Sequence, residues 1–203
     1  MWMNTVLTKA DQQIRLLYAK EFSAPVIASK LDISLNRVYR SLRKQKIQRR
    51  SPSEQNRIRF DNSPLSFRFK QHLNSREREL LIATTMLYYG EGAKNGSTVD
   101  FANSDPRTLT LFLKFLRIIC RVDETRLRFY LYCFENQNAT NLINFWTQHL
   151  KVKNDSFTKP YVRKNNGDLK RVMPYGVLHI RYSDKRLLHK ILSLINEIAN
   201  QFN

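Results

Sequence analysis

Residues 77–92 contain the pattern that most restricts how this chain can fold. Three charged residues open the segment, ten uncharged residues follow at 80–89, and Glu91 then lies between two glycines. The uncharged run is far shorter than the roughly 18 residues of a membrane-spanning helix. A helix that is apolar on nearly every face needs cover on nearly every face. We therefore expect it to lie between its own sheet and another element or subunit.

Glu91 falls where this helix is expected to end. A helix C-terminus carries partial negative charge, which opposes a carboxylate at that position. Without a nearby cation Glu91 is poorly placed for stability, and its presence favours a functional role for the carboxylate.

The charge balance of the chain indicates its partners. Its 203 residues include 35 Lys and Arg against 17 Asp and Glu, a formal net charge of +18. Such a surplus attracts phosphate polyanions or anionic membrane surfaces, and nucleic acid is the leading class. With 42% hydrophobic residues the chain can form a core, and only 5 Gly and 6 Pro exclude collagen-like and low-complexity classes.

Cysteine usage and the N-terminal residues predict the compartment. Cys120 and Cys133 are too few for a disulfide scaffold, and no Cys-x-x-Cys or Cys/His cluster offers a zinc site. Residues 1–11 lack the apolar core of a signal peptide, and no membrane span is present. We expect a soluble, cytoplasmic protein without a membrane partner, although an organellar origin remains open.

A basic segment divides the chain. Residues 37–59 contain nine Lys and Arg and one acid, and Pro52 interrupts any helix that runs through it. We predict a DNA-binding domain at 1–48, a basic linker at 49–70 and a larger domain at 71–203.

The first domain shows helical periodicity in three short segments. Ser34 can cap the third helix, and Ile33 can fill the space beneath the preceding turn. Residues 25–40 resemble the helix-turn-helix of DNA-binding regulators and recombinases. Ala28 matches the small residue where the helices cross, and Asp32 replaces the usual glycine of the turn.

The third helix carries residue types that suit a DNA major groove. Asn pairs with adenine and Arg with guanine, whereas basic residues at the far end of the helix suit phosphate. A solvated basic face on a protein-binding bundle is the alternative. The candidate DNA-binding residues of this helix are Asn36, Arg37, Tyr39, Arg40, Arg43 and Lys44.

The second domain alternates between helical and strand patterns. Residues 126–133 alternate strictly, with Leu127, Phe129, Leu131 and Cys133 on one face and Arg126, Arg128, Tyr130 and Tyr132 on the other. Further strands are expected at 97–101, 157–163 and 175–182. Helices are expected at 109–119, 141–150 and 185–199, and Asp105 before Pro106 indicates an N-cap. The connection at 164–171 holds an Asn-Gly turn, which favours a hairpin between the last two strands.

Gly90, Glu91 and Gly92, the Asn95-Gly96 turn, the following strand and Asn103-Ser104-Asp105 together resemble the LAGLIDADG homing endonuclease family. In that family two such helices pack at a pseudo-twofold axis and deliver acids to a divalent-metal site. The resemblance covers roughly residues 77–200, with Ala83, Thr84 and Thr85 as small packing residues. It implies an α+β saddle domain of αββαββα type with a mostly antiparallel sheet. A single motif implies a homodimer on a near-palindromic site.

The resemblance implies a homing endonuclease, a hydrolase of double-stranded DNA encoded by a mobile genetic element. Glu91 from each subunit would bind Mg²⁺ or another divalent cation, and water would attack the phosphodiester. Lys159 and Arg181, with Lys94 as a third candidate, would stabilise the phosphate charge; the alternative is an ordinary phosphate contact. His179 is expected to be structural or to contact DNA. The DNA-binding residues expected in this domain are Arg126, Arg128, Tyr130, Arg163, Lys164, Lys170 and Arg171.

A transcription regulator offers a second interpretation. Such a protein would keep the LAGLIDADG-like fold for DNA binding without cutting, as in sporulation-type regulators that join these two modules. A basic protein that coats nucleic acid is a third and weaker interpretation, since it explains the charge but not Glu91.

Overall fold

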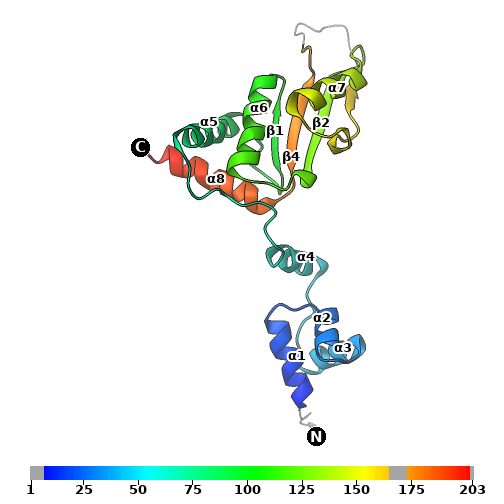
Figure 1. Ribbon diagram of the computed structural model, residues 1–203. Coiled ribbons are helices and arrows are strands. Elements are labelled where there is room, and N and C mark those ends of the chain that lie inside the picture. The colour runs from blue at the N-terminus through cyan, green and yellow to red at the C-terminus, as the bar shows by residue number, and fades with distance from the viewer. Residues whose placement is uncertain (1–6, 165–172, 202–203) are drawn as a thin grey trace. The chain divides into compact units, whose positions relative to one another are not determined.

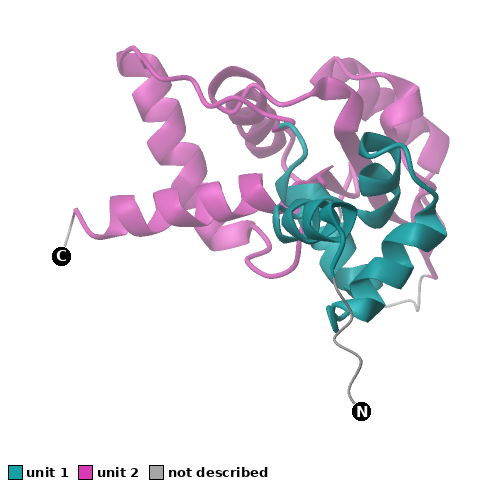
Figure 2. Ribbon diagram, turned by 90° about the horizontal axis from the view of Figure 1, so that it is seen from below, with its two compact units in different colours: residues 1–64 teal, residues 65–203 magenta. Residues whose placement is uncertain are grey.

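The computed structural model describes residues 7–164 and 173–201 of the chain. The chain forms two compact units, residues 1–64 and 65–203, shown in different colours in Figure 2. The division falls inside the segment 49–70 that the sequence assigned to a linker. Each unit has its own hydrophobic core, and the two are described separately.

The first unit begins with the three predicted helices, α1 (Lys9–Ala19), α2 (Ala24–Lys30) and α3 (Leu35–Lys44). Their apolar faces meet in a small core of Ile14, Tyr18, Ala24, Ile27, Val38 and Leu42. Ser34 caps α3 as predicted, because its hydroxyl accepts a hydrogen bond of 3.2 Å from the backbone N–H of Arg37. Asp32 adopts a left-handed conformation with φ +50°, the geometry expected at the glycine position of the turn.

A fourth helix, α4 (Pro52–Asp61), was not predicted from the sequence. Pro52 is its first residue, a position where proline costs nothing because that N–H has no helical partner. Ser51 and Glu54 form a reciprocal capping box at its start. None of its residues is buried, so local capping and not a core holds this helix.

The second unit is α+β (Figure 1). Its main helices and strands are α5 (Ser75–Glu91), β1 (Val99–Asn103), α6 (Pro106–Lys114), β2 (Leu127–Phe134), α7 (Ala139–Leu150), β3 (Tyr161–Arg163), β4 (Val177–Tyr182) and α8 (Lys185–Ala199). A π-helical turn, η1 (Phe115–Ile119), extends α6, and single 3₁₀ turns, η2 (Glu124–Arg126) and η3 (Asn154–Ser156), precede β2 and β3. As predicted, Asp105 caps α6, with its carboxylate 2.8 Å from the backbone N–H of Arg107.

The four strands form one open sheet in the order β1-β4-β2-β3. Alternate residues of each long strand face a core to which α5, α6, α7 and α8 all contribute, and the predicted alternation of β2 is confirmed. The intervening residues form the opposite side, here called the open face. It consists of Asp100, Ala102, Arg128, Tyr130, Tyr132, Phe134, Tyr161, Arg163, Val177, His179 and Arg181.

Two predicted features of the sheet are wrong. The strands around the 164–171 connection do not form a hairpin, because β3 pairs in parallel with β2 while β4 lies between β1 and β2. The turn expected at Asn166-Gly167 lies outside the described residues. The unit also runs αβαβαββα instead of αββαββα, since α6 follows β1 directly and α7 separates β2 from β3.

Within a single chain, helix α5 is only partly covered. Thr84, Thr85 and Tyr88 are buried in the unit's own core, but Ile82 and Tyr89 are 48% and 52% exposed. None of the described helices has the length and apolar character needed to cross a membrane.

Candidate nucleic-acid interface

The α3 helix presents only part of its basic side chains to solvent. Asn36, Arg40 and Arg43 are exposed, as the sequence predicted. Tyr39 is half-buried, and the guanidinium of Arg49 lies 4.2 Å from the centre of its ring. The remaining basic residues of α3, Arg37 and Lys44, are engaged by an acid of α1.

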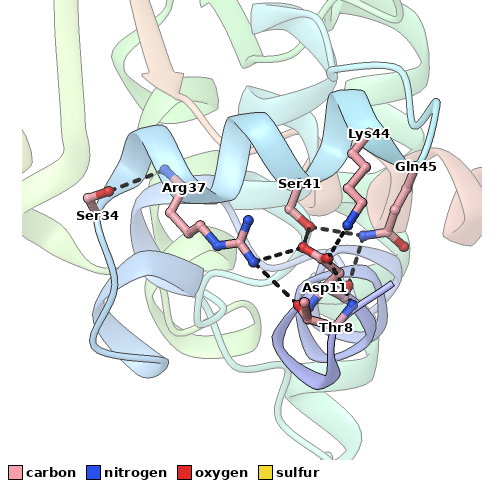
Figure 3. A network of polar contacts seen from close by, with 7 residues as sticks. All are labelled: Thr8, Asp11, Ser34, Arg37, Ser41, Lys44 and Gln45. Atoms are coloured by element: carbon pink, nitrogen blue, oxygen red, sulfur yellow. Dashed lines mark hydrogen bonds and ion pairs between the residues drawn. The ribbon is translucent and has the colours of Figure 1, made fainter. Parts of the chain in front are cut away.

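Arg37 and Lys44 bind Asp11, a residue of α1 that is 0% exposed (Figure 3). Each cation lies 3.2 Å from one carboxylate oxygen of Asp11. The Ser41 hydroxyl donates to the same carboxylate at 2.7 Å. Arg37 and Lys44 lie outside the hydrophobic core, and their side chains, 34% and 23% exposed, are engaged by this buried carboxylate.

The Asp11 network is fully hydrogen-bonded at the carboxylate. The Ser41 hydroxyl, the Thr8 N–H and Lys44 together outweigh burial and hold the pKa of Asp11 well below its usual range. Gln45 also donates to the Asp11 carbonyl at 2.8 Å. Asp11 thus fixes α1 against α3 and sets the orientation of the helix that carries Arg40.

One basic residue of the 37–59 segment is likewise structural. The Arg50 guanidinium lies 3.9 Å from the ring centre of Tyr18 and donates to the Phe22 carbonyl at 3.1 Å. The backbone N–H of Arg50 also donates to the Tyr18 hydroxyl at 2.9 Å. Arg50 therefore joins the start of α4 to the three-helix core.

In the second unit, the strand register arranges the open face in rows. Asp100, Arg181 and Arg128 form one row across β1, β4 and β2. The next row along contains His179 and Tyr130. One end of the open face is therefore charged, whereas the centre is aromatic.

Asp100 organises the charged end of the open face. One of its oxygens lies 2.8 Å from Nδ1 of His179, and the other accepts from Nε of Arg181 at 2.8 Å. Partial burial raises the pKa of Asp100, but the hydrogen bonds and charges of these two partners lower it further, so the net shift is downward. Asp100 is an ionised carboxylate that orients Arg181 on a surface reachable by a ligand.

The sequence analysis missed Asp100 as a site residue. It lies between two buried residues of a strand, Val99 and Phe101, and this alternation alone placed it on the open face. Its partners are 79 and 81 residues away in the chain, and no local pattern identifies them. His179, expected to be structural or DNA-contacting, lies on the open face with a carboxylate partner.

Glu91 is the last residue of α5 and is exposed. Its backbone is fixed by the residues around it: the buried Tyr88 hydroxyl donates to the Ala93 carbonyl at 2.6 Å, and Ala93 pairs with Asp100. Burial raises the pKa of Tyr88 to about 12. Gly92 packs so closely on Tyr88 that a Cβ atom there would lie 2.4 Å from the ring. A glycine after Glu91 is thus required by this close approach.

The remaining predicted site residues are dispersed. Arg126 lies in η2, before the strand, where it donates to the Ser183 carbonyl at 2.6 Å and leaves the open face. Lys159 is exposed but precedes β3, so its expected position on a strand is wrong. Arg163 ends β3 and Lys164 follows it, both exposed, and Lys94 lies three residues after Glu91. Lys170 and Arg171 lie outside the described residues.

Within residues 7–164 and 173–201, no three His, Cys, Asp or Glu side chains come together as a metal-binding group. Comparison with protein-family models, curated proteins and solved structures found no match to this chain.

Proposed function

We propose that this protein binds double-stranded DNA through both units and that a homodimer cleaves it with a divalent metal ion held by Glu91 of each copy. The observation that carries the proposal is an exposed apolar stripe on α5 that leads to Glu91. Ile82, Met86 and Tyr89 are spaced as neighbours on one side of the helix and are 48%, 37% and 52% exposed. Ala83 and Gly90 border them and are also exposed.

The stripe supports pairing of two copies because it is apolar, is bordered by the small residues Ala83 and Gly90, and lies next to Glu91. Exposed contiguous apolar residues on a helix mark an interaction site more often than chance exposure. A twofold contact between identical stripes would place the α5 C-termini of both copies in one region. The predicted packing residues Thr84 and Thr85 are buried within the unit, so Ala83 alone of the three is available to this contact.

The donor chemistry of the paired state fits Mg²⁺. Mg²⁺ takes six oxygen ligands and commonly uses one or two carboxylates together with phosphate oxygens and waters. Two Glu91 carboxylates, together with phosphate oxygens and waters, would supply such a ligand set. When bound, such an ion supplies Lewis acidity and neutralises charge on the phosphodiester.

The chain's own cations would assist by holding the DNA phosphates. Lys94 extends toward the end of α5, with Nζ 3.5 Å from the Gly92 carbonyl. Arg181 has a fixed orientation from Asp100 and is suited to a phosphate or to a guanine edge. Arg40 and Arg43 on α3 would supply further contacts from the first unit.

The second candidate is a regulator that binds DNA without cutting it. One observation favours it: among the described residues of a single chain, no three His, Cys, Asp or Glu side chains form a metal-binding group. This protein would use the same exposed residues of α3 and the same open face.

Incubation of the purified protein with the DNA that flanks its gene tests the proposal. We expect discrete cleavage products with Mg²⁺ and intact DNA with EDTA. Binding without products under either condition would establish the regulator, and absence of binding to any duplex would overturn both candidates.

The homodimer has a separate test. Met86→Asp should convert the protein from dimer to monomer in light scattering after size exclusion, because it places a charge within the apolar stripe. Ile118→Asp is the matched control, since Ile118 is 40% exposed in the same unit but outside the stripe. Equal oligomeric states for the parent and Met86→Asp would contradict pairing through α5.

A further inference from the structure

Four rings form a continuous series across the open face. The ring centres of Tyr130 and Tyr132 are 5.0 Å apart, those of Tyr132 and His179 are 4.8 Å apart, and those of Tyr132 and Tyr161 are 5.2 Å apart. The register explains this series, because Tyr132 pairs with Tyr161 on β3 while Tyr130 pairs with His179 on β4. Three strands thus contribute to one aromatic surface.

Core packing does not account for these rings. The alternate residues of β2, such as Phe129 and Leu131, already fill the core on the other side of the sheet. Tyr161 is 49% exposed, and Tyr130, Tyr132 and His179 are half-buried by one another. A contiguous aromatic surface that stays accessible in this way is typical of a binding site.

A cavity lies at the end of the series where β2 meets β3. It has a volume of about 470 Å³, and its lining includes Tyr132, Tyr161, Phe134, Arg163 and Met173. Aromatic rings, a thioether and one guanidinium are a suitable lining for a flat, polarisable ring next to a phosphate. The cavity is therefore matched to a nucleobase on an anionic backbone.

The charges around the rings point to the same ligand. The Arg181 guanidinium lies 4.9 Å from the ring centre of Tyr130, and Arg163 borders the cavity at the other end of the series. Arg128 is exposed beside Arg181 in the register. Cations at both ends of an aromatic surface, in a chain of net charge +18, suit a nucleic-acid strand that crosses the sheet.

We propose that the open face binds unpaired nucleobases by stacking, with Tyr132 and Tyr161 as the central stacking pair. The inference rests on the proposed function only in that it also takes nucleic acid as the ligand. It goes further by naming single-stranded or locally opened nucleic acid as a substrate class for this face.

The physical reason for unpaired bases is geometric. In an intact duplex the flat faces of the bases are covered by their neighbours, and only base edges are reachable in the grooves. A tyrosine ring on a sheet binds the flat face of a base, which is accessible only when that base is unpaired.

Fluorescence anisotropy with the full chain tests this proposal. The probes are a labelled 12-nucleotide single-stranded DNA, the matching RNA, the fully paired DNA duplex, and the same duplex with a central unpaired segment. We expect Tyr161→Leu to weaken binding of the single strands and of the opened duplex by about 5- to 100-fold. Affinity for the fully paired duplex should change less than twofold.

Two further variants separate stacking from other effects. Tyr161→Phe retains the ring and should bind single strands like the parent. Val162→Ala changes the adjacent exposed residue, which pairs with Cys133 and therefore alternates to the other face of β3, and should leave all affinities unchanged. Since Tyr161 is exposed, Tyr161→Leu should unfold at the parental temperature.

The outcomes are distinguishable from those of the proposed function. An equal loss of single-strand and duplex affinity in Tyr161→Leu, or no loss in either, would overturn the stacking proposal and leave DNA cleavage to be judged by its own assay. If Tyr161→Leu loses affinity for single strands only, and the parent never cleaves DNA, the stacking proposal is supported and the endonuclease proposal fails. A loss of affinity in Tyr161→Leu that is confined to RNA or to single-stranded DNA would support stacking and identify which nucleic acid the open face binds.

Discussion

Asp11 in the first unit and Asp100 in the second each bind cations, yet the two regions use this arrangement differently. Asp11 is 0% exposed and draws Arg37 and Lys44 toward the interior of a helical unit. The Asp100 side chain is 21% exposed and holds Arg181 and His179 on the outside of a sheet. The same pairing of charges joins two helices in one place and holds an accessible guanidinium on a sheet surface in the other.

The difference follows from where the carboxylate lies. A buried anion needs every oxygen satisfied, so it recruits whichever cations its neighbours can provide. A partly exposed anion keeps more of its hydration, so it needs fewer partners, and those partners stay accessible to a ligand. Counting the basic residues of a helix or strand therefore overestimates its capacity for nucleic acid wherever a buried acid lies nearby.

The largest expected effect is on the stability of the first unit. Asp11→Ala should lower its free energy of unfolding by about 3 kcal/mol, because it removes the acceptor of a buried network and leaves two cations facing each other. Hydrogen exchange of the α1–α3 amides measures this loss. Asp61→Ala, at an exposed acid of the same unit, is the control and should be neutral. Asp100→Ala should cost its own unit no more than about 1 kcal/mol, and a cost equal to that of Asp11→Ala would remove the contrast.

The stability of the first unit should also depend on pH through Asp11. The pKa of Asp11 is depressed in the folded protein, so its contribution is fully present above its ordinary value of 3.8 and is lost as the pH falls below that value. The difference in stability between parent and Asp11→Ala, measured by hydrogen exchange, should therefore be constant from pH 7 to about pH 4 and begin to narrow as the pH approaches 3. A difference that stays constant down to pH 3 would show that ionisation of Asp11 does not stabilise the unit.

Two arginines on α3 separate the structural and binding roles. Arg40→Ala should weaken binding to a preferred duplex by about 1 to 3 kcal/mol with little change in stability, as expected for an exposed base contact. Arg37→Ala should instead lower the stability of the first unit by about 1 kcal/mol, through loss of its bond to Asp11. Titration with DNA and thermal unfolding of both variants measure the two effects. A loss of stability in Arg40→Ala with a loss of only DNA affinity in Arg37→Ala would contradict the assigned roles.

The smallest expected effect concerns the orientation of Arg181. Asp100→Asn removes a negative charge, so binding to random DNA should be unchanged or slightly tighter. The preference for a selected site over random DNA should shrink by about 1 kcal/mol, because Arg181 loses the partner that fixes its direction. Competition between the two DNAs measures this ratio, and an undiminished preference would show that Asp100 does not position a reading residue.

Much of the fold was predictable because local signals were strong. The bounds of α8 and the alternation of β2 came from periodicity, and the caps at Ser34 and Asp105 came from residue type next to a helical pattern. Helix α4 was missed because Pro52 was interpreted as a breaker. The spacing of Ser51 and Glu54 was the available signal for a capped helix start.

The features that were not predictable depend on distant parts of the chain. An Asn-Gly turn favours a hairpin, yet β3 gains its hydrogen bonds from β2, about 30 residues earlier in the chain. The partners of Asp11 and of Asp100 are likewise set by packing and register. Residue types therefore predicted which side chains could contact nucleic acid, whereas only the fold separated the structural cations from the accessible ones.

Glu91 provides the most direct test of the central claim that a paired carboxylate supports DNA cleavage. Glu91→Gln keeps the size of the side chain, leaves the Tyr88 and Gly92 contact intact, and removes an anion from a helix C-terminus, so folding should be unchanged or improved by about 0.3 to 1 kcal/mol. Glu79→Gln, an exposed acid on the same helix, is the matched control.

The measurement is the rate of Mg²⁺-dependent cleavage by parent, Glu91→Gln and Glu79→Gln at saturating DNA. We expect Glu91→Gln to bind its site like the parent and to lose cleavage by several orders of magnitude, while Glu79→Gln retains it. Cleavage by Glu91→Gln at the parental rate would contradict the assignment of Glu91 as the metal-binding acid.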